Sequence, residues 1–280
     1  MNFGTRLERA LAARGSLCVG IDPHAALLEK WGLGDDIVSL ERFAMTCAEA
    51  FGGLAAMVKP QSAFFERFGS AGIAVLERTV AALRQQGTLV LLDVKRGDIG
   101  STMSAYAEAY LDPTADLAVD AITVSPFLGV GSLAPAFDLA GLVGAGVFVL
   151  ALTSNPEGAG VQHALTETGR TVAQDIIDQV AARNEPAPPT GGVSLGSFGV
   201  VVGATIGESV ADLAEFNGPF LVPGIGAQGG TAADVRRIFG PACRSVLPSV
   251  SRQVLGAGPS LTELRAATER AIAEFAFLRA

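Results

Sequence analysis

Leu91-Leu-Asp-Val-Lys-Arg-Gly-Asp-Ile99 is an apolar, strand-like segment that carries two acids and an amine at its end. Apolar residues before the lysine are typical of a β-strand, and the glycine after it marks a turn. Because side chains two apart on a strand share a face, Asp93 and Lys95 are predicted to point the same way. Asp98 lies just past the strand, where a loop can turn it back toward the same space. This rim indicates a site that handles charge rather than a packed core.

Short apolar runs of this kind recur eight times along the chain. Near-continuous apolar strands that alternate with helices indicate a parallel sheet, and eight of them predict a single-domain (β/α)8 TIM barrel over residues 1–280. The alternative is an open doubly wound sheet, which more often has a glycine-rich phosphate turn where this chain has Asp22-Pro-His24. The predicted strands are Leu17–Asp22, Ala56–Lys59, Val90–Lys95, Ala121–Ser125, Val147–Ser154, Gly199–Thr205, Phe220–Gly226 and Ser245–Ser251.

Helical spacing fills the intervals between strands, clearest at Ala71–Gln86, Thr168–Arg183 and Thr231–Phe239. One interval, between Gln179 and Gly199, is too long for a barrel connection. Its Pro/Gly-rich stretch, at about 184–198, predicts a loop. We interpret this loop as a surface insertion, with an active-site lid as the alternative.

The composition excludes several classes of protein. With 280 residues, 49% of them hydrophobic and 17% charged, the chain can form a large core and is not disordered. A net charge of −8 without any block of lysine or arginine argues against nucleic-acid binding. The N-terminus lacks a signal core, and the longest apolar run, Ala140–Leu152, is too short to span a bilayer. We therefore expect a soluble, cytoplasmic protein with no membrane partner.

Cysteine and histidine are too few and too scattered to favour a metal site. Cys18, Cys47 and Cys243 form no C-x-x-C pair, and His24 and His163 lie far apart in the sequence. We expect no metal ion and three buried thiols in a reducing cytoplasm.

Polar residues gather where the predicted strands end. They are Asp22, Lys59, Asp93, Lys95, Asp98, Ser154, Gln228 and Arg252. A barrel enzyme builds its site from these C-terminal ends. Taken singly, an aspartate before Pro23 organises a turn, but Lys59 has apolar neighbours and would be buried there only with a partner. Because these polar residues converge at the C-terminal ends of the predicted strands, a functional site is favoured over a structural ion-pair network.

The segment Pro223-Gly-Ile-Gly-Ala-Gln-Gly-Gly230 is a glycine-rich turn that runs into a helix beginning near Thr231. Exposed backbone amides and a helix N-terminus favour a phosphate group. Arg252, just beyond the last predicted strand, adds a forked pair of donors. Because barrels often bind phosphate between the loops after strands seven and eight, we predict an anion site there.

With these residues in place, the chain resembles the orotidine 5′-phosphate decarboxylase family, in its longer bacterial branch. Asp93-x-Lys95-x-x-Asp98 is similar to the family's central motif, which sugar-phosphate relatives share. The resemblance covers the barrel from the first predicted strand to the last, and five matching segments in one order make it specific. The other four are Gly20-Ile-Asp-Pro23, Val58-Lys-Pro-Gln-Ser-Ala-Phe-Phe-Glu66, Leu152-Thr-Ser-Asn-Pro-Glu-Gly158 and Pro223-Gly-Ile-Gly-Ala-Gln-Gly-Gly230.

The resemblance implies a carboxy-lyase without a cofactor, which decarboxylates orotidine 5′-monophosphate to UMP in de novo pyrimidine biosynthesis. Lys59, Asp93, Lys95 and Asp98 would form a charged tetrad, in which Lys95 stabilises the C6 carbanion and protonates it. Asp98 would reach, with Thr102, into the neighbouring subunit's site. The resemblance therefore implies a homodimer.

Further residues are implied to bind the substrate. Asp22 and Lys59 would bind ribose hydroxyls, and Ser154 the pyrimidine. Many family members have glycine where this chain has Ser251, whose amide donates equally well, so the departure concerns local backbone shape. Pro223 and Ile225 would line an apolar wall. The residues that would bind the phosphate are Gln228, Gly229, Ser251 and Arg252.

Two other functions stay open. A metal-dependent sugar-phosphate decarboxylase or aldolase of the same barrel superfamily binds Mg2+ with similar carboxylates. Lys59 and Lys95 at the same site make a divalent cation electrostatically awkward. A non-catalytic barrel that binds a phosphorylated ligand would keep Gln228 and Arg252 but would need no alternation of acids and amines.

Overall fold

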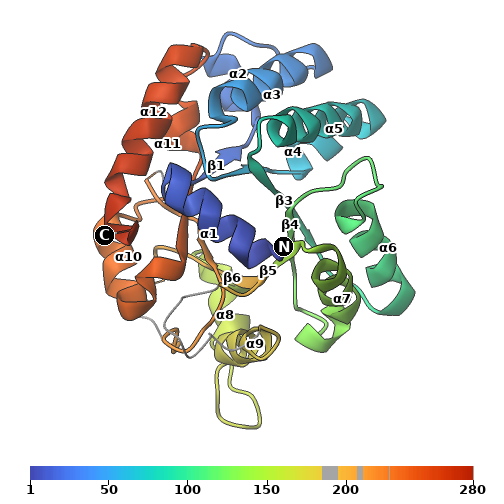
Figure 1. Cartoon of the computed structure of the whole chain (residues 1–280), viewed down its shortest axis with the longest axis vertical. Helices are drawn as coiled ribbons and strands as arrows, with labels where there is room; N and C mark the ends of the chain where they lie inside the picture. The colour runs from blue at the N-terminus through green and yellow to red at the C-terminus, as the bar shows by residue number, and fades with distance from the viewer. Residues whose placement is uncertain (185–194, 207–210, 227, 280) are drawn as a thin grey trace.

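The computed structural model describes residues 1–184, 195–206, 211–226 and 228–279 of the chain. Within these residues, eight parallel strands close into a barrel in chain order, with the last strand paired to the first (Figure 1). The predicted (β/α)8 TIM barrel is confirmed, and an open sheet is excluded. The strands are β1 Cys18–Ile21, β2 Met57–Pro60, β3 Leu89–Arg96, β4 Ala121–Val124, β5 Gly146–Leu152, β6 Phe198–Val202, β7 Phe220–Val222 and β8 Val246–Val250.

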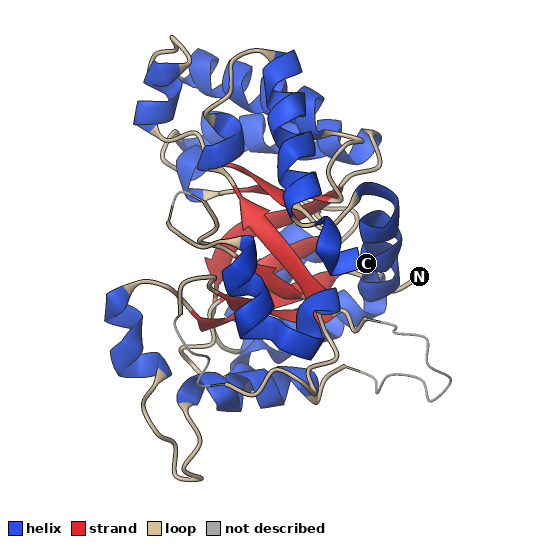
Figure 2. Cartoon of the chain, turned by 90° about the vertical axis from the view of Figure 1, so that its left-hand side faces the viewer, coloured by secondary structure: helices blue, strands red, loops and turns tan. Residues whose placement is uncertain are grey.

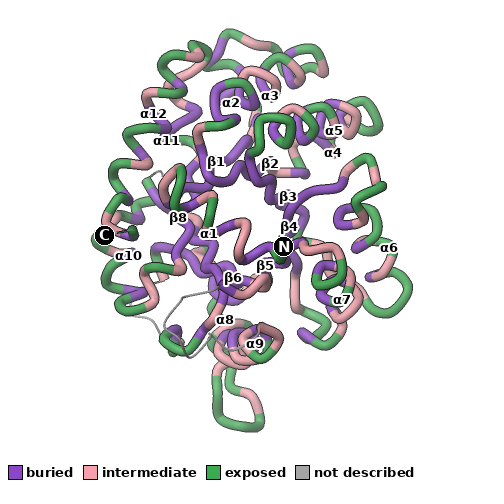
Figure 3. The backbone as a smooth tube through the Cα atoms, in the orientation of Figure 1, coloured by how far each residue is buried: buried purple, intermediate pink, exposed green. Residues whose placement is uncertain are grey.

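Helices surround the strands on the outside (Figure 2). The α-helices are α1 Phe3–Arg14, α2 Ala25–Lys30, α3 Ile37–Phe51, α4 Ala63–Glu66, α5 Gly69–Gln85, α6 Gly100–Leu111, α7 Ala134–Val143, α8 Ala159–Gln162, α9 Val172–Ala181, α10 Ala232–Phe239, α11 Arg252–Leu255 and α12 Leu261–Glu274. Short 3-10 helices cover Val130–Leu133, Pro156–Gly158, Gly240–Ser245 and Ala276–Arg279. The strands are buried along almost their full length, and apart from Lys95 at the end of β3 the exposed residues lie on helices and loops (Figure 3).

Helix α1 closes one end of the barrel. Asn2 begins it by accepting a hydrogen bond from the Thr5 N–H at 2.9 Å. Phe3, Leu7 and Leu11 are fully buried and join a cluster with inward-facing residues of all eight strands. Figure 1 shows α1 lying across the barrel. With the end that holds the strand beginnings filled by apolar side chains, a site has room only at the C-terminal ends of the strands.

Two predicted strands are shorter than their apolar runs. Strand β6 ends at Val202 rather than Thr205, and β7 ends at Val222 rather than Gly226. Beyond these ends the backbone still hydrogen-bonds to neighbouring strands, and the Gly203 N–H donates to the Leu152 carbonyl at 2.9 Å. The apolar pattern thus continues after the regular sheet has ended, because the loops at this end are themselves packed.

Helices α5, α9 and α10 confirm the three predicted helices, with ends that differ by a few residues. Most of the Pro/Gly-rich stretch predicted at about 184–198 lies outside the described residues. Its interpretation, and the single-domain organisation of residues 1–280, therefore stay predictions. Along the described chain, no helix combines the length and the apolar composition needed to cross a membrane.

The cysteine prediction is confirmed for two thiols and wrong for the third. Cys18 and Cys47 are buried, whereas Cys243 is only partly buried beside the end of α10. Burial raises the pKa of the Cys18 thiol to about 12, so this side chain stays protonated beneath the strand ends.

Candidate active site

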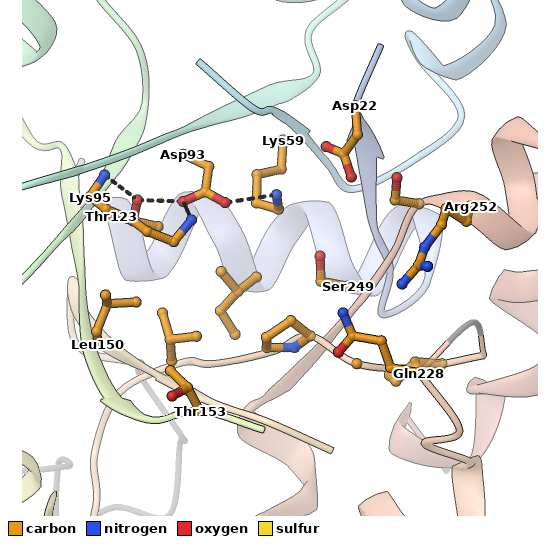
Figure 4. Close-up of a pocket in the computed structure, with 16 residues that line it drawn as sticks. Asp22, Lys59, Asp93, Lys95, Thr123, Leu150, Thr153, Gln228, Ser249 and Arg252 are labelled. Atoms are coloured by element: carbon orange, nitrogen blue, oxygen red, sulfur yellow. Dashed lines mark hydrogen bonds and ion pairs between the residues drawn. The ribbon is translucent and has the colours of Figure 1, made fainter. Parts of the chain in front are cut away.

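One cavity at the C-terminal ends of the strands collects most of the residues that the sequence singles out (Figure 4). Its predicted lining residues are Asp22, Lys59, Asp93, Lys95, Pro223, Ile225, Gln228, Ser251 and Arg252. They come from β2, β3 and the segments that follow β1, β7 and β8. Strand ends far apart in the sequence therefore share one site, as a closed barrel requires.

Asp93 is the centre of the charged end of this cavity. Its Oδ1 accepts hydrogen bonds from Lys95 Nζ at 2.6 Å and from the Thr123 hydroxyl at 2.7 Å, and its Oδ2 accepts one from Lys59 Nζ at 3.0 Å. Asp93 and Lys59 are each 7% exposed, so these contacts replace water. Lys59 thus has the partner that its apolar surroundings demand.

Both charges are stabilised by this pairing. Burial disfavours the Asp93 carboxylate, but the ammonium groups of Lys59 and Lys95 outweigh it and hold the pKa of Asp93 well below its usual range. Burial likewise disfavours the Lys59 ammonium, but Asp93 and Asp22 raise the pKa of Lys59 above its ordinary value. Asp93 and Lys59 are therefore charged at neutral pH.

The end of β3 bends at Lys95. The register of β3 against β4 shifts between Leu92 and Arg96, and Lys95 has a φ of 45° in the left-handed region. Gly97 follows, where a Cβ would lie only 2.4 Å from the Ser125 carbonyl oxygen. This close approach explains why the turn marked by the sequence requires glycine.

Polar atoms that lack partners lie in the opposite end of the cavity and beside it. Within the described residues, the buried atoms Asp22 Oδ1, Ser154 Oγ and Ser251 Oγ have no hydrogen-bond partner. Figure 4 shows Arg252 and Gln228 at this end, away from Lys95. Two donors and several unpartnered oxygens suit a ligand that carries hydroxyl and anionic groups.

Ser154 lies slightly apart from the other predicted residues. It does not line the cavity itself, which is lined by its neighbour Thr153. A Cβ on Gly203 would lie 2.2 Å from Ser154 Oγ, and one on Gly224 would lie 3.4 Å from it. The hydroxyl is thus enclosed between the ends of β6 and β7.

The glycine-rich turn after β7 is folded on its own backbone. The Gly226 N–H donates to the Gly230 carbonyl at 2.9 Å, and the Gly229 N–H donates to the Gly226 carbonyl at 2.8 Å. Thr231 and Asp234 form a capping box at the start of α10. These contacts occupy amides that we expected to face an anion, so the side chains of Gln228 and Arg252 are the better donors in the cavity.

Asp98 and Thr102 do not line the cavity of their own chain. Asp98 accepts a hydrogen bond from the Ile99 N–H at 2.8 Å, and Thr102 is exposed on α6. The loop after β3 therefore leaves Asp98 outside the cavity that Asp93 and Lys95 line. Strand geometry carries Lys95 into the cavity, but the start of α6 leads the chain away from it.

Several lining residues were missed from the sequence. Thr123 and Ser249 lie inside apolar strands, where alternation places them on the inward face between outward-facing neighbours. That alternation was a usable signal, but a single hydroxyl in a strand is an ordinary feature. The others are Leu150, Thr153, Val201, Leu221 and Gly224.

Comparison with known proteins agrees with this geometry. A family profile described as "Orotidine 5'-phosphate decarboxylase / HUMPS family" matches residues 15–267. The orotidine 5′-phosphate decarboxylase of Salinispora arenicola is 63% identical over 273 residues, which are 98% of this chain and 96% of the relative.

Solved structures agree as well. A crystal structure from Streptomyces avermitilis, provisionally named orotidine 5′-phosphate decarboxylase, has a TM-score of 0.94 and 57% identity, and the match covers 100% of this chain and 96% of the other. The structure of Leishmania donovani OMP decarboxylase has a TM-score of 0.74 and 31% identity, covering 100% of this chain and 99% of the other. These matches span the whole barrel rather than one motif.

Proposed function

The chain belongs to the orotidine 5′-phosphate decarboxylase / HUMPS family, and from this premise we propose how it acts as a carboxy-lyase on orotidine 5′-monophosphate. The product is UMP, formed in de novo pyrimidine biosynthesis. Lys95 stabilises the carbanion left at C6 and then protonates it, with no cofactor. We assign this reaction to the cytoplasm, where a biosynthetic enzyme with three free thiols would remain reduced.

The observation that carries the mechanism is the pair of ammonium groups on Asp93. Lys59 Nζ and Lys95 Nζ contact different oxygens of one buried carboxylate, at 3.0 and 2.6 Å. An ammonium held in this way is already oriented before the substrate arrives, which is the condition for electrostatic stabilisation of a developing charge. The reaction needs this cation because the C6 carbanion has little resonance stabilisation.

Proton delivery uses the same group. The Lys95 side chain is 45% exposed whereas that of Asp93 is 9% exposed, so its ammonium reaches the cavity while its partner stays buried. A cation at C6 that also carries a transferable proton serves as stabiliser and general acid at once. Asp93, beside the substrate carboxylate, adds ground-state destabilisation as a secondary effect.

The unpartnered end of the cavity would bind the rest of the substrate. We assign ribose hydroxyls to Asp22 and Lys59, the pyrimidine to Ser154, and an apolar wall to Pro223 and Ile225. Gln228 and Arg252, with the amide of Ser251, would bind the phosphate, whereas the Gly229 amide is engaged by the Gly226 carbonyl. Because the phosphate is remote from the breaking bond, its binding energy can be used to organise the charged end.

We propose that the active form is a homodimer in which Asp98 and Thr102 complete the partner's site. Exposed apolar side chains beside Asp98 support this proposal. Of the eight large hydrophobic residues that are exposed in the described chain, five follow the ends of three adjacent strands, β3, β4 and β5. They are Ile99, Phe127, Leu128, Val161 and Leu165. Exposed apolar side chains at the ends of adjacent strands are typical of an interface.

The dimer can be tested by mixing two inactive variants. Asp98→Ala keeps Lys95, and Lys95→Ala keeps Asp98, so a hybrid dimer would contain one intact site. Random exchange should restore activity at about one quarter of the sites. A mixture as inactive as either variant alone would contradict the crossing of Asp98.

The nearest alternative is a metal-dependent sugar-phosphate decarboxylase or aldolase. Such a site needs carboxylate oxygens that are open to Mg2+. Both oxygens of Asp93 are engaged by donors, two of which are cations, and this occupation favours the amine-centred mechanism.

One assay decides between these functions. Purified protein should convert orotidine 5′-monophosphate to UMP, followed by loss of absorbance, and EDTA should leave the rate unchanged. Turnover that disappears with EDTA would favour the metal-dependent alternative. Tight binding of the substrate without UMP formation would favour a non-catalytic barrel.

A further inference from the structure

The backbone of Lys95 adopts a conformation that needs support from its surroundings. Lys95 is the one non-glycine residue with a positive φ among those that the structure describes. A residue with a Cβ is disfavoured in this region and persists there only where neighbouring contacts hold it. Lys95 also lies within the register break between Leu92 and Arg96, where the regular ladder to β4 is interrupted.

Thr123, on β4, supplies these contacts with a single hydroxyl. Its Oγ1 accepts a hydrogen bond from the Lys95 N–H at 3.0 Å and donates one to Asp93 Oδ1 at 2.7 Å. Lys95 Nζ donates to the same Oδ1 at 2.6 Å. The Lys95 N–H, the hydroxyl, the carboxylate oxygen and the Lys95 ammonium thus form a closed ring (Figure 4). Thr123 is 1% exposed, which leaves little room for water to replace its hydroxyl.

The outer side of the same turn is held differently. Arg96 forms an ion pair with Glu66 at 2.6 Å and donates to the Tyr110 hydroxyl at 3.3 Å. These contacts restrain the residue after Lys95 without touching the Asp93 carboxylate. Among the described side chains, Thr123 is the one that hydrogen-bonds both the Lys95 backbone and Asp93.

We propose that Thr123 is a positioning residue for the decarboxylation described above, on which this inference rests. It holds Lys95 in its left-handed conformation and thereby aims the ammonium at C6. The lysine side chain is long and partly exposed, so its direction is set by its backbone and by Asp93. Without the hydroxyl, the Lys95 N–H loses its acceptor and the strand end can relax toward an extended conformation.

The decisive variant is Thr123→Val, which keeps the shape of the side chain and removes the hydroxyl. We expect kcat to fall roughly 10- to 100-fold, because general acid catalysis depends on the geometry of the donor. KM should stay within about threefold, since Thr123 lies at the charged end of the cavity, away from the residues assigned to the phosphate. Thr123→Ser, which restores the hydroxyl, should recover most of kcat.

A matched control separates positioning from stability. Thr79 on α5 is fully buried, and its hydroxyl donates to the Val75 carbonyl at 2.8 Å. Thr79→Val therefore removes a buried hydroxyl of the same kind far from the cavity. It should leave kcat unchanged, even if it lowers the melting temperature as much as Thr123→Val does. Thr123→Ala serves as a second variant if the valine protein does not fold.

A structural readout tests the anchor independently of turnover. Hydrogen exchange of the Lys95 amide should be slow in the wild type and in Thr123→Ser, and faster in Thr123→Val. Unchanged exchange, or a kcat for Thr123→Val equal to that of Thr123→Ser, would overturn the inference. Failure of the proposed function looks different: the wild type itself would form no UMP, while the exchange result would still decide whether Thr123 anchors Lys95.

Discussion

The two ends of the cavity differ in how their polar groups are satisfied. At one end, Asp93 is engaged by Lys59, Lys95 and Thr123. At the other, oxygens of Asp22 and Ser251, and of Ser154 beside the cavity, are buried without partners in the described chain. A buried polar atom without a hydrogen bond costs free energy that a ligand can recover.

This difference indicates that the two ends of the cavity have different functions. The charged end is organised by its own contacts before a substrate binds, as electrostatic catalysis requires. The other end gains its missing partners only from a ligand. Substitutions at the charged end should therefore reduce the chemical step, and those at the opposite end should reduce the free energy of substrate binding.

The largest expected effect tests the charged end. Lys95→Ala should lower the rate of decarboxylation by many orders of magnitude, because it removes both the cation and the proton donor. The rate of UMP formation measures this change. Lys30→Ala on α2, at an exposed lysine, is the control and should keep full activity. Substantial turnover by Lys95→Ala would remove Lys95 from the central role.

The next effect tests the ligand-binding end. Arg252→Ala should lower kcat/KM roughly 1,000-fold, because charge-assisted hydrogen bonds to the phosphate are lost. This change corresponds to several kcal/mol of activation free energy. The fold should be intact, since Arg252 is exposed and lines the cavity rather than the core. Arg42→Ala, at another exposed arginine, provides the comparison. A kcat/KM near that of the wild type would refute the phosphate assignment.

A smaller effect concerns the backbone packing at the ligand-binding end. A Cβ on Gly20 would lie 2.9 Å from the Ser251 Cβ and 3.3 Å from Asp22 Oδ1. Gly20→Ala should therefore destabilise the fold by about 1–3 kcal/mol, measured by chemical denaturation. Adding Ser251→Gly should recover most of this loss, because the clashing side chain is gone. If the destabilisation of the double variant equals the sum of the two single destabilisations, Ser251 is not the reason for glycine at position 20.

The smallest effect is the pH dependence of stability. Asp93 has a lowered pKa in the folded protein, so its contribution is present above the unfolded pKa of about 3.9 and is lost as the pH falls below it. Between pH 5 and pH 3, Asp93 alone should account for about 1 kcal/mol of lost stability.

Denaturation curves at several pH values, compared with those of Asp93→Asn, measure this contribution. The pKa of Lys59 is raised, so its contribution is present below its unfolded pKa of about 10.4 and is lost as the pH rises above it. If the free energy of unfolding of Asp93→Asn falls with decreasing pH as steeply as that of the wild type, Asp93 does not couple folding to protonation.

Much of the site was accessible from the sequence because strand ends are readable. Lys59 and Asp93 lie at the ends of apolar runs, and a closed barrel brings all such ends together. Asp98 was harder, since the path of a chain after a strand depends on the turn and the helix that follow. The glycine-rich turn was recognised as a turn, but its internal hydrogen bonds could not be read from glycine spacing.

Eight apolar runs are enough to predict the barrel, and alternation along one strand is enough to predict the charged segment of β3. Both are local patterns, which the chain specifies without reference to distant residues. The contacts of Thr123 with Lys95 and Asp93, and of Ser251 with Gly20, could not be predicted from local patterns and are seen only in the folded barrel. Those contacts depend on the register between neighbouring strands, which is set by packing of the closed barrel rather than by spacing along the chain.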